Sequence, residues 1–340
     1  MAVSVTRFIH SNIGIDLGTA NTLVYKHNYG IIIREPSVVA LNQHNQKVLA
    51  IGEKAYDMVG KTPTSIVAIR PLRDGVISDY QTTQAMLQHF LRLTNPRFYQ
   101  RIQLVVGIPY GITSVEKRAV RDAAHMAGAH RCFLIDEPLA AAIGAGHDIF
   151  EPMGRLIVDI GGGTTEVAVI SMGSIVLSES IRIAGDKMDE SIIQHCRKHY
   201  NLLISERCAE RIKWTIGSAL SLQNEKNTDV SGRDLLSGLP RTFSISSMEI
   251  RDAIDGAIHA ILAAIHRTLE STPPELSADI YKNGITLTGG GALLRGLSDH
   301  IQNHIHIPVR IANDPLSCVA LGTGTVLGQL DRYLKHQIIQ

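Results

Sequence analysis

Short apolar runs alternate with amphipathic stretches from one end of the chain to the other. Runs rich in β-branched and other apolar residues, such as 104–108 and 132–135, predict buried strands. The stretches 79–93 and 246–269 carry the pattern of amphipathic helices. Strands and helices that alternate in this way indicate an α/β fold.

Helix-start signals support this reading of the pattern. Asp79 precedes a helical stretch and is expected to be its N-cap. Thr113 with Glu116, and Ser246 with Glu249, have the spacing of a capping box, in which the two residues satisfy each other's backbone N–H groups. These signals predict where three of the helices begin.

One pattern occurs twice. Residues 13–19 and 157–164 each contain an apolar strand that ends in Asp, followed by a glycine-containing turn and a second apolar strand. The two aspartates, Asp16 and Asp159, are 143 residues apart. A repeat at this distance predicts two related halves rather than a solenoid. Each half would offer one Asp–Gly turn to a cleft between them.

Length and charge narrow the range of functions. A chain of 340 residues suggests about two domains, and 44% apolar residues suffice for a sizeable core. The 33 basic and 32 acidic residues give a net charge of +1. We therefore expect no nucleic-acid partner, because such proteins carry a clustered basic excess.

The cysteines and the hydropathy pattern indicate the compartment. Four widely spaced cysteines form no CxxC pair, which argues against a zinc site or a disulfide framework and favours a reducing cytoplasm. No run approaches 18 apolar residues, and the first residues lack the apolar core of a signal peptide. We expect no membrane-spanning segment.

The repeated turns have the chemistry of phosphate binding. The free N–H groups of a glycine-rich turn form a small anion-binding nest. An Asp at the strand end, Asp16 or Asp159, can hold Mg²⁺ through water, because Mg²⁺ keeps most of its hydration shell. One copy alone is typical of an ordinary hairpin, but two copies in matching contexts predict a phosphate clamp. The donors offered are Gly18, Thr19, Ala20 and Asn21 in the first turn and Gly161, Gly162, Gly163 and Thr164 in the second.

Three further features carry two interpretations each. Thr288-Gly-Gly-Gly-Ala292 is either tight strand–helix packing or a flat glycine floor under a nucleotide. At the strand-to-helix junction before Pro138, Asp136 is expected to cap the helix, which leaves Glu137 to position a water. Glu210 and Lys213, three residues apart on one helix face, are either a solvated ion pair or part of a site.

Other catalytic motifs are absent. The chain has no GxxxxGK[ST], no GxGxxG that opens a βα unit, and no GxSxG, HExxH or kinase signature. Two close histidine pairs, 125/130 and 304/306, have no carboxylate at metal-ligand spacing. We expect surface or packing roles for these histidines.

Taken together, the motifs resemble the actin/sugar-kinase/heat-shock ATPase superfamily, and within it the MreB/Mbl bacterial actins. The resemblance extends from about Ile13 to Leu330. The matching segments are residues 16–22, 35–39, 69–77, 159–166, 184–187, 272–279 and 288–294.

This resemblance implies an actin-like α/β fold with two related ribonuclease-H-like halves around a nucleotide cleft and four subdomains. The first half would span residues 1–145, with a small subdomain inserted at about 33–68. The second would span 146–340, with a small subdomain at about 182–244 and a C-terminal helix that returns to the first half.

The resemblance also implies ATP and Mg²⁺ as cofactors of an ATPase. It implies that Asp16 and Asp159 hold Mg²⁺ through water, and that Glu137 and Thr164 position the attacking water. Glu210 and Lys213 would reach the ribose and base. The full set that it places against ATP is Thr19, Ala20, Asn21, Gly161, Gly162, Gly163, Glu210, Lys213, Gly289, Gly290, Gly291 and Ala292.

The implied function is a cytoskeletal filament that determines cell shape. The chain would polymerise with itself on the inner face of the cytoplasmic membrane and organise cell-wall elongation proteins. Many relatives carry an amphipathic N-terminal helix, but Met1–Asn12 is short and has few apolar residues. Membrane contact is therefore assigned to Phe98 and Tyr99, which are otherwise expected to pack inward. The alternative function on the same fold is a monomeric small-molecule kinase.

Overall fold

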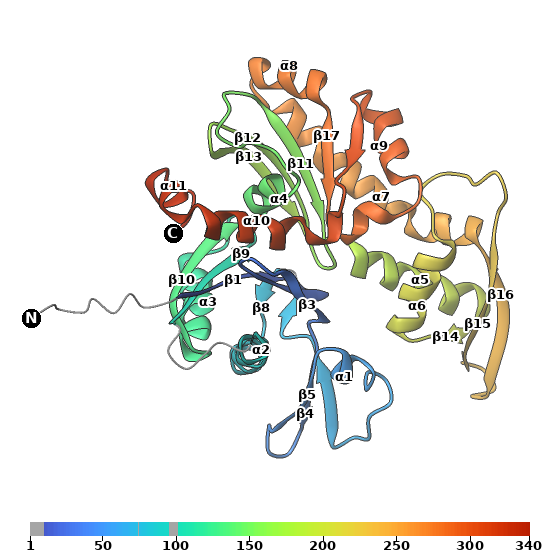
Figure 1. The fold of residues 1–340 in the computed structure, drawn as a ribbon. Helices are drawn as coiled ribbons and strands as arrows, with labels where there is room; N and C mark the ends of the chain where they lie inside the picture. The colour runs from blue at the N-terminus through green and yellow to red at the C-terminus, as the bar shows by residue number, and fades with distance from the viewer. Residues whose placement is uncertain (1–9, 74, 95–100) are drawn as a thin grey trace, which may run out of the picture. The chain divides into compact units, whose positions relative to one another are not determined.

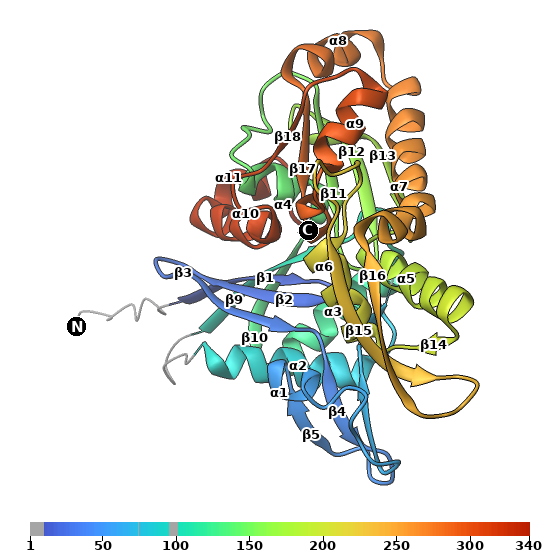
Figure 2. The ribbon, with the colours of Figure 1, turned by 90° about the vertical axis from the view of Figure 1, so that its right-hand side faces the viewer.

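The computed structural model describes residues 10–73, 75–94 and 101–340 (Figure 1, Figure 2). The chain divides into two compact units. Unit 1 consists of Met1–Asp148 together with Ser317–Gln340, and unit 2 consists of Ile149–Leu316. The C-terminal segment therefore belongs to the same unit as the N-terminal half.

Unit 1 is built on a five-stranded mixed sheet with the order β10-β9-β1-β2-β3. Strand β1 is antiparallel to β2 and parallel to β9, so it is the junction between the two directions. Helices α4 and α10 cover one face of the sheet, and α2 and α3 cover the other (Figure 1, Figure 2). The bounds are β1 His10–Leu17, β2 Asn21–Lys26, β3 Gly30–Pro36, β9 Arg101–Ile108, β10 Ala129–Asp136, α2 Tyr80–Leu93, α3 Ser114–Met126, α4 Glu137–Gly144 and α10 Cys318–Gly328.

Two glycines let α4 and α10 approach each other closely. A Cβ at Gly144 would lie 1.8 Å from the carbonyl oxygen of Cys318, and one at Gly322 would lie 1.9 Å from that of Ala140. Neither position has room for a side chain. This contact fixes α4, whose first residue is Glu137, against the sheet.

Smaller elements complete unit 1. One is a three-stranded sheet with a short helix. The others are a hairpin of two strands with two residues each and a short helix before the C-terminus. Their bounds are β4 Val39–Asn42, β5 Val48–Ile51, β6 Ile66–Ile69, α1 Glu53–Tyr56, β7 Leu72–Arg73, β8 Val76–Ile77 and α11 Leu330–Lys335.

Unit 2 repeats the plan of the first sheet. Its strand order is β13-β12-β11-β17-β18, with β11 antiparallel to β12 and parallel to β17. Strand β11 therefore takes the place of β1, β12 that of β2, and β17 that of β9. The repeat seen in the sequence is a repeat of topology. The bounds are β11 Arg155–Ile160, β12 Thr165–Ser171, β13 Ser174–Ile181, β17 Ile285–Thr288 and β18 Val309–Ile311.

In unit 2, one apolar core is enclosed by the helices, by this sheet and by a second, smaller sheet. The long helix α7 packs on β12 and β13, while α5 and α6 join the small sheet to the core. The remaining bounds are α5 Gly185–Tyr200, β14 Leu202–Leu203, α6 Glu206–Ile216, β15 Asn227–Asp234, β16 Pro240–Ser246, α7 Ser247–Glu270, α8 Pro274–Asn283, the 3₁₀ turns η1 Gly290–Leu293 and η2 Pro315–Ser317, and α9 Leu297–Ile305.

The predicted helix starts are confirmed. Asp79 accepts a hydrogen bond from the Thr82 N–H, and both predicted capping boxes are formed, by Thr113 with Glu116 and by Ser246 with Glu249. In contrast, the capping role expected for Asp136 is wrong.

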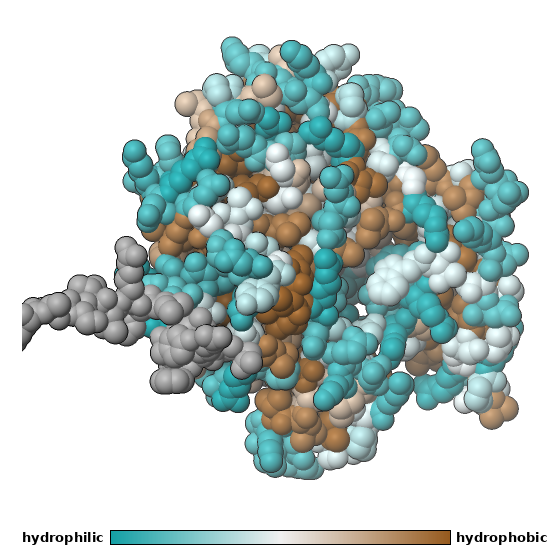
Figure 3. Space-filling model, in the orientation of Figure 1, coloured by the Kyte–Doolittle hydropathy of each residue, from teal (hydrophilic) through white to brown (hydrophobic). Residues whose placement is uncertain are grey.

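Hydrophilic and hydrophobic side chains are interspersed on the face shown in Figure 3. Within the described ranges, no helix is both long and apolar enough to cross a membrane.

Candidate functional site

The first Asp–Gly turn follows the central strand of unit 1. Asp16 is half-buried near the end of β1, opposite Gly107 of β9. A Cβ at Gly18 would lie only 2.6 Å from the carbonyl oxygen of Asn21, so the tight turn has room only for glycine there. Carboxyl ends of parallel strands are where α/β folds bind ligands. Asp16 and the turn lie at this edge.

Two segments distant in sequence hold this turn. The Ser37 Oγ donates to the carbonyl of Gly18 at 2.6 Å, and the Ser37 N–H donates to the carbonyl of Ala20 at 2.9 Å. The buried Thr19 hydroxyl accepts a 3.3 Å hydrogen bond from the Gly75 N–H. Ser37 and Gly75 were not singled out by the sequence analysis, although both lie in segments that resemble the family.

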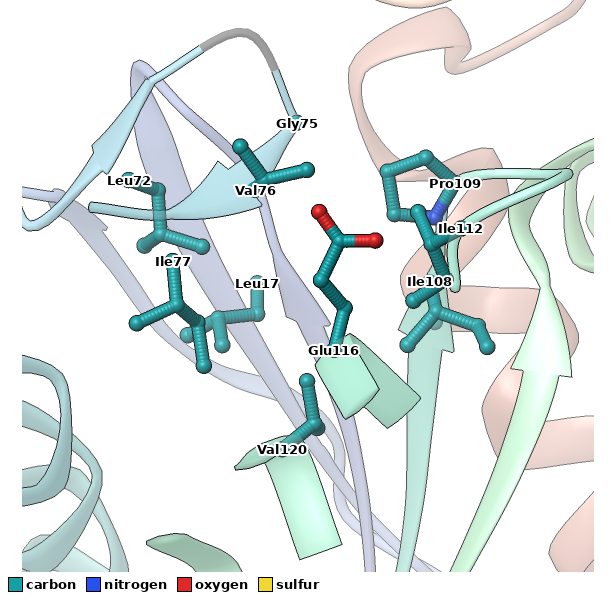
Figure 4. A pocket seen from close by; sticks show the side chains of 11 residues that line it. Leu17, Leu72, Gly75, Val76, Ile77, Ile108, Pro109, Ile112, Glu116 and Val120 are labelled. Atoms are coloured by element: carbon teal, nitrogen blue, oxygen red, sulfur yellow. The ribbon is translucent and has the colours of Figure 1, made fainter. Parts of the chain in front are cut away.

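A small apolar pocket lies below the β7–β8 hairpin that carries Gly75 (Figure 4). Side chains of β1, the hairpin and α3 line it, and Glu116 points into its mouth. Both the backbone N–H and the hydroxyl of Thr113 donate to the Glu116 carboxylate. The one carboxylate at this pocket is therefore already used to cap α3.

Glu137 stands at the same edge of the sheet as Asp16. It is half-buried at the start of α4, and a Cβ built on Gly107 would lie 3.5 Å from its Cγ. Gly107 of β9 connects the two positions, because it lies opposite Asp16 and a Cβ built on it would contact the Glu137 side chain. Glu137 and Asp16 therefore lie at the ends of parallel strands of the same unit.

Asp136 does not cap α4. It occupies the N-cap position, but its side chain makes no capping hydrogen bond. Burial raises the pKa of Asp136, opposed by the charge of Lys117. The preference of Asp for N-caps therefore predicted the position correctly but not the contact, because the carboxyl group is drawn into a partly buried environment.

The second turn follows the central strand of unit 2. Asp159 is buried near the end of β11, where its Oδ1 accepts a 2.8 Å hydrogen bond from the Thr288 hydroxyl of β17. Burial raises the pKa of Asp159 to about 6, against the opposing effect of the Thr288 hydrogen bond. A carboxylate held in this way is destabilised until a cation or other donor approaches it.

The raised pKa predicts how Asp159→Asn changes stability. Because the folded state holds the Asp159 proton up to about pH 6, the free energy of unfolding should fall as the pH rises from about 4 to about 6. A shift of about two pKa units corresponds to about 3 kcal/mol. Without nucleotide or Mg²⁺, Asp159→Asn should therefore be more stable than the parent above pH 6 by up to this amount, and little different at pH 4.

Urea unfolding at several pH values measures this difference. Asp229→Asn, which replaces an exposed aspartate of the same unit, is the matched control and should show no such pH-dependent gain. An Asp159→Asn variant that is less stable than the parent at pH 8 would contradict the conclusion that burial destabilises the Asp159 carboxylate.

The glycines of the second turn are fixed by α5. The Gly185 N–H donates to the carbonyl of Gly161 at 3.2 Å, and the Asp186 N–H donates to that of Gly162 at 2.8 Å. The described residues contain no cis peptide bond. In a trans peptide the carbonyl of one residue and the N–H of the next residue point in opposite directions. The N–H groups of Gly162 and Gly163 consequently point away from α5, which leaves them available to an anion.

Thr164 closes this turn. Its carbonyl accepts a 2.9 Å hydrogen bond from the Gly161 N–H, and the residue is half-buried. Thr164 directly precedes β12 and lies in the same turn as the two outward amides. It therefore belongs to the turn whose donors the repeat predicts to bind phosphate.

The third glycine cluster is closely packed against the second turn. A Cβ at Gly289 would lie 2.3 Å from the carbonyl oxygen of Ile160 and 2.7 Å from Oδ1 of Asp159, and one at Gly291 would lie 2.2 Å from Cγ2 of Ile160. The packing interpretation therefore describes Gly289 and Gly291. Gly290 is exposed, Ala292 is buried, and the segment continues as the 3₁₀ helix η1.

Lys213 is not a solvated surface cation. Its Nζ donates to Oδ2 of Asp189 and to the carbonyl of Gly185, both at 2.8 Å, and only 12% of its side chain is exposed. Glu210 lies one turn earlier on α6 and is half-buried. Asp189 was not among the predicted site residues, because its only sequence signal is its position four residues after Gly185 on a helix.

Two points concern residues outside this geometry. Phe98 and Tyr99, assigned to membrane contact, lie outside the described residues. Over the ranges that the structure describes, no three His, Cys, Asp or Glu side chains gather as a metal cage. Mg²⁺ needs no such cage, because one or two carboxylates with phosphate oxygens and water are its usual ligands.

Comparison with known protein sequences extends over nearly the whole chain. The family model described as MreB/Mbl protein matches residues 10–335. The chain is 48% identical over 328 residues to the cell shape-determining protein Mbl of Bacillus subtilis (strain 168), which covers 96% of this chain and 98% of that protein. It is 48% identical over 329 residues to the cell shape-determining protein MreB of Escherichia coli (strain K12), with 95% of each covered.

Solved structures are also similar to this chain over nearly its whole length. The crystal structure of MreB5 of Spiroplasma citri bound to ADP has a TM-score of 0.92 at 40% identity and covers 96% of this chain and 98% of its own. The structure of the same protein bound to AMPPNP has a TM-score of 0.91. The MamK double helical filament, at 22% identity, shares the fold with a TM-score of 0.81 and covers 94% and 99%. The expected actin-like fold class is confirmed.

Proposed function

This chain belongs to the MreB/Mbl family, and we propose that it is an ATPase that assembles into filaments and thereby determines cell shape. The observation that carries the proposal is the repeated turn. Asp16 and Asp159 occupy corresponding strand ends in two sheets of the same topology, each followed by a turn with backbone donors. A triphosphate with Mg²⁺ is the ligand that needs both carboxylates and many N–H donors.

Each residue has a proposed role. Asp16 and Asp159 hold Mg²⁺ through water, and the bound metal would neutralise charge on the phosphates. The backbone of residues 19–21 and 161–163 binds phosphate oxygens, while Glu137 and Thr164 position the attacking water. Glu210 and the 289–292 segment contact the nucleoside.

The chemistry of these positions supports ATP and Mg²⁺ over other ligands. A buried Asp159 with a raised pKa gains most from a nearby cation. The outward amides of Gly162 and Gly163 gain most from an anion, and they lie four residues or fewer from that carboxylate in sequence. A cation and an anion presented together are what a metal–nucleotide complex supplies.

The cellular setting is proposed from family membership. The relatives of Bacillus subtilis and Escherichia coli are named cell shape-determining proteins. We assign this chain to the cytoplasm, at the inner face of the cell membrane, with itself and the cell-wall elongation proteins as partners. Phe98 and Tyr99 are the proposed membrane contact.

A sedimentation assay tests the proposal against the alternative of a small-molecule kinase. The purified full chain should pellet with Mg²⁺ and ATP, remain in the supernatant without nucleotide, and release free phosphate without an added acceptor. A protein that stays in the supernatant in both conditions and consumes ATP only when a sugar or carboxylic acid is added would be a kinase, and the proposal would fail.

A further inference from the structure

The start of α5 lacks a capping side chain of its own. Its N-cap residue, Ala184, cannot accept a hydrogen bond through its side chain, and the first two helical N–H groups bind carbonyls of the glycine turn instead. Unpaired N–H groups at a helix start must find partners. The turn and the helix therefore depend on each other, because the turn supplies acceptors for the helix N–H groups and the helix supplies donors that hold the turn carbonyls.

Three elements meet at Gly185. A Cβ at this residue would lie 3.4 Å from the carbonyl oxygen of Gly161, 3.4 Å from Nζ of Lys213 and 3.7 Å from Cα of Gly162. Lys213 extends from α6 and donates to the carbonyl of Gly185 itself. The ammonium group thus lies directly behind the residue that anchors the turn.

Asp189 keeps Lys213 in this position. Its Oδ2 accepts from Lys213 at 2.8 Å, one helical turn after Gly185, and the aspartate is 7% exposed. Burial raises the pKa of Asp189 to about 7, while Lys213 opposes this effect and the charges of Glu210 and Asp186 add to it. Within the described part of the chain, Oδ1 of Asp189 is buried without a hydrogen-bond partner.

Burying such an ion pair carries a desolvation penalty, so its position is not explained by a gain in stability alone. A buried ion pair is often no more stabilising than two apolar residues of similar size. Two of the three Lys213 hydrogens are directed at α5. These bonds connect α6 to the helix start that orients the phosphate-binding amides.

We propose that the Asp189–Lys213 pair is a positioning device that holds the start of α5, and through it the 161–163 turn, in its phosphate-binding shape. Lys213 then acts on the phosphates indirectly rather than by contact with the ribose or base. The inference rests on the proposed nucleotide binding. It also makes a claim about the nucleotide-free protein, which can be tested separately.

The nucleotide-free test is hydrogen exchange in the full chain. Asp189→Leu with Lys213→Met replaces the pair by apolar residues of similar size, which should preserve the core. The Gly185 and Asp186 amides should exchange at least about tenfold faster, the loss expected for a charge-assisted hydrogen bond, while α7 amides keep their protection. The matched control removes the exposed Lys187–Glu190 pair on the same helix with Lys187→Met and Glu190→Gln.

The second readout is calorimetric affinity for Mg-ATP and for adenosine. The paired apolar variant should bind Mg-ATP at least about tenfold more weakly and adenosine as the parent does. Lys213→Arg, which keeps the charge, should recover part of the loss. If the paired variant does not fold, Asp189→Asn, which keeps the shape, should give the same pattern.

The outcomes are distinct. Unchanged exchange and unchanged Mg-ATP affinity would make the pair merely structural and overturn the proposal. Equal losses for Mg-ATP and adenosine would mean that Lys213 contacts the nucleoside directly, which also overturns it. A parent protein that binds neither ligand would contradict the proposed function, while faster exchange at Gly185 and Asp186 would still support the positioning role.

Discussion

Glu137→Ala should slow ATP hydrolysis by about 10²–10⁴-fold, the usual contribution of a positioned acid or base, and leave Mg-ATP affinity close to that of the parent. The carboxyl group stands over Gly107 at the sheet edge, at the start of a helix fixed by close contacts with α10. It can therefore orient a water without being needed to bind the nucleotide. Phosphate release measured together with ATP affinity tests both halves of the prediction.

The competing explanation is that Glu137 supports the start of α4. Asp136→Asn is the matched control, since Asp136 is the neighbouring carboxyl group and makes no capping hydrogen bond. It should hydrolyse ATP at nearly the parental rate. If Asp136→Asn is as slow as Glu137→Ala, or if Glu137→Ala has a much lower melting temperature, the slow rate reflects the helix start and not the water.

Asp16→Asn and Asp159→Asn should each weaken Mg-ATP binding by about 10- to 150-fold, which corresponds to the loss of one hydrogen bond to a charged group. Each carboxylate lies near the end of the central strand of a different five-stranded sheet. Each should therefore contribute to Mg-ATP binding independently. Calorimetry with Mg²⁺ and with a chelator separates the metal-dependent part. Affinity measured with the chelator should change little.

Asp159→Asn carries its own control against unfolding. The same substitution is expected to stabilise the nucleotide-free protein above pH 6, so weaker binding by a more stable protein cannot be attributed to a damaged fold. Unchanged Mg-ATP affinity in either variant would remove that aspartate from the metal site.

Short-range patterns predicted much of the fold. The repeated hairpins, the two capping boxes and the strand–helix junction before Pro138 depend on residues a few positions apart, so local chemistry determines them. The matching strand orders of the two sheets follow from the same repeat. The resemblance to the bacterial actins rested on motifs of this local kind.

The contacts that support the turns could not be read in the same way. Asp189 and Lys213 are 24 residues apart, and Asp159 and Thr288 are 129 apart. No local pattern indicates which helix will bring a lysine to a given aspartate. The spacing of Glu210 and Lys213 suggested a partner on the same helix, whereas tertiary packing gave Lys213 a partner on α5.

The most direct test of the central claim is electron microscopy of the purified full chain, with and without Mg-ATP. If two aspartate turns bind Mg-ATP and binding drives assembly, the parent protein should form filaments with Mg-ATP and none without nucleotide. The Asp16→Asn variant should form far fewer under the same conditions. Filaments that form equally well without nucleotide, or a protein that binds Mg-ATP and never assembles, would contradict the account.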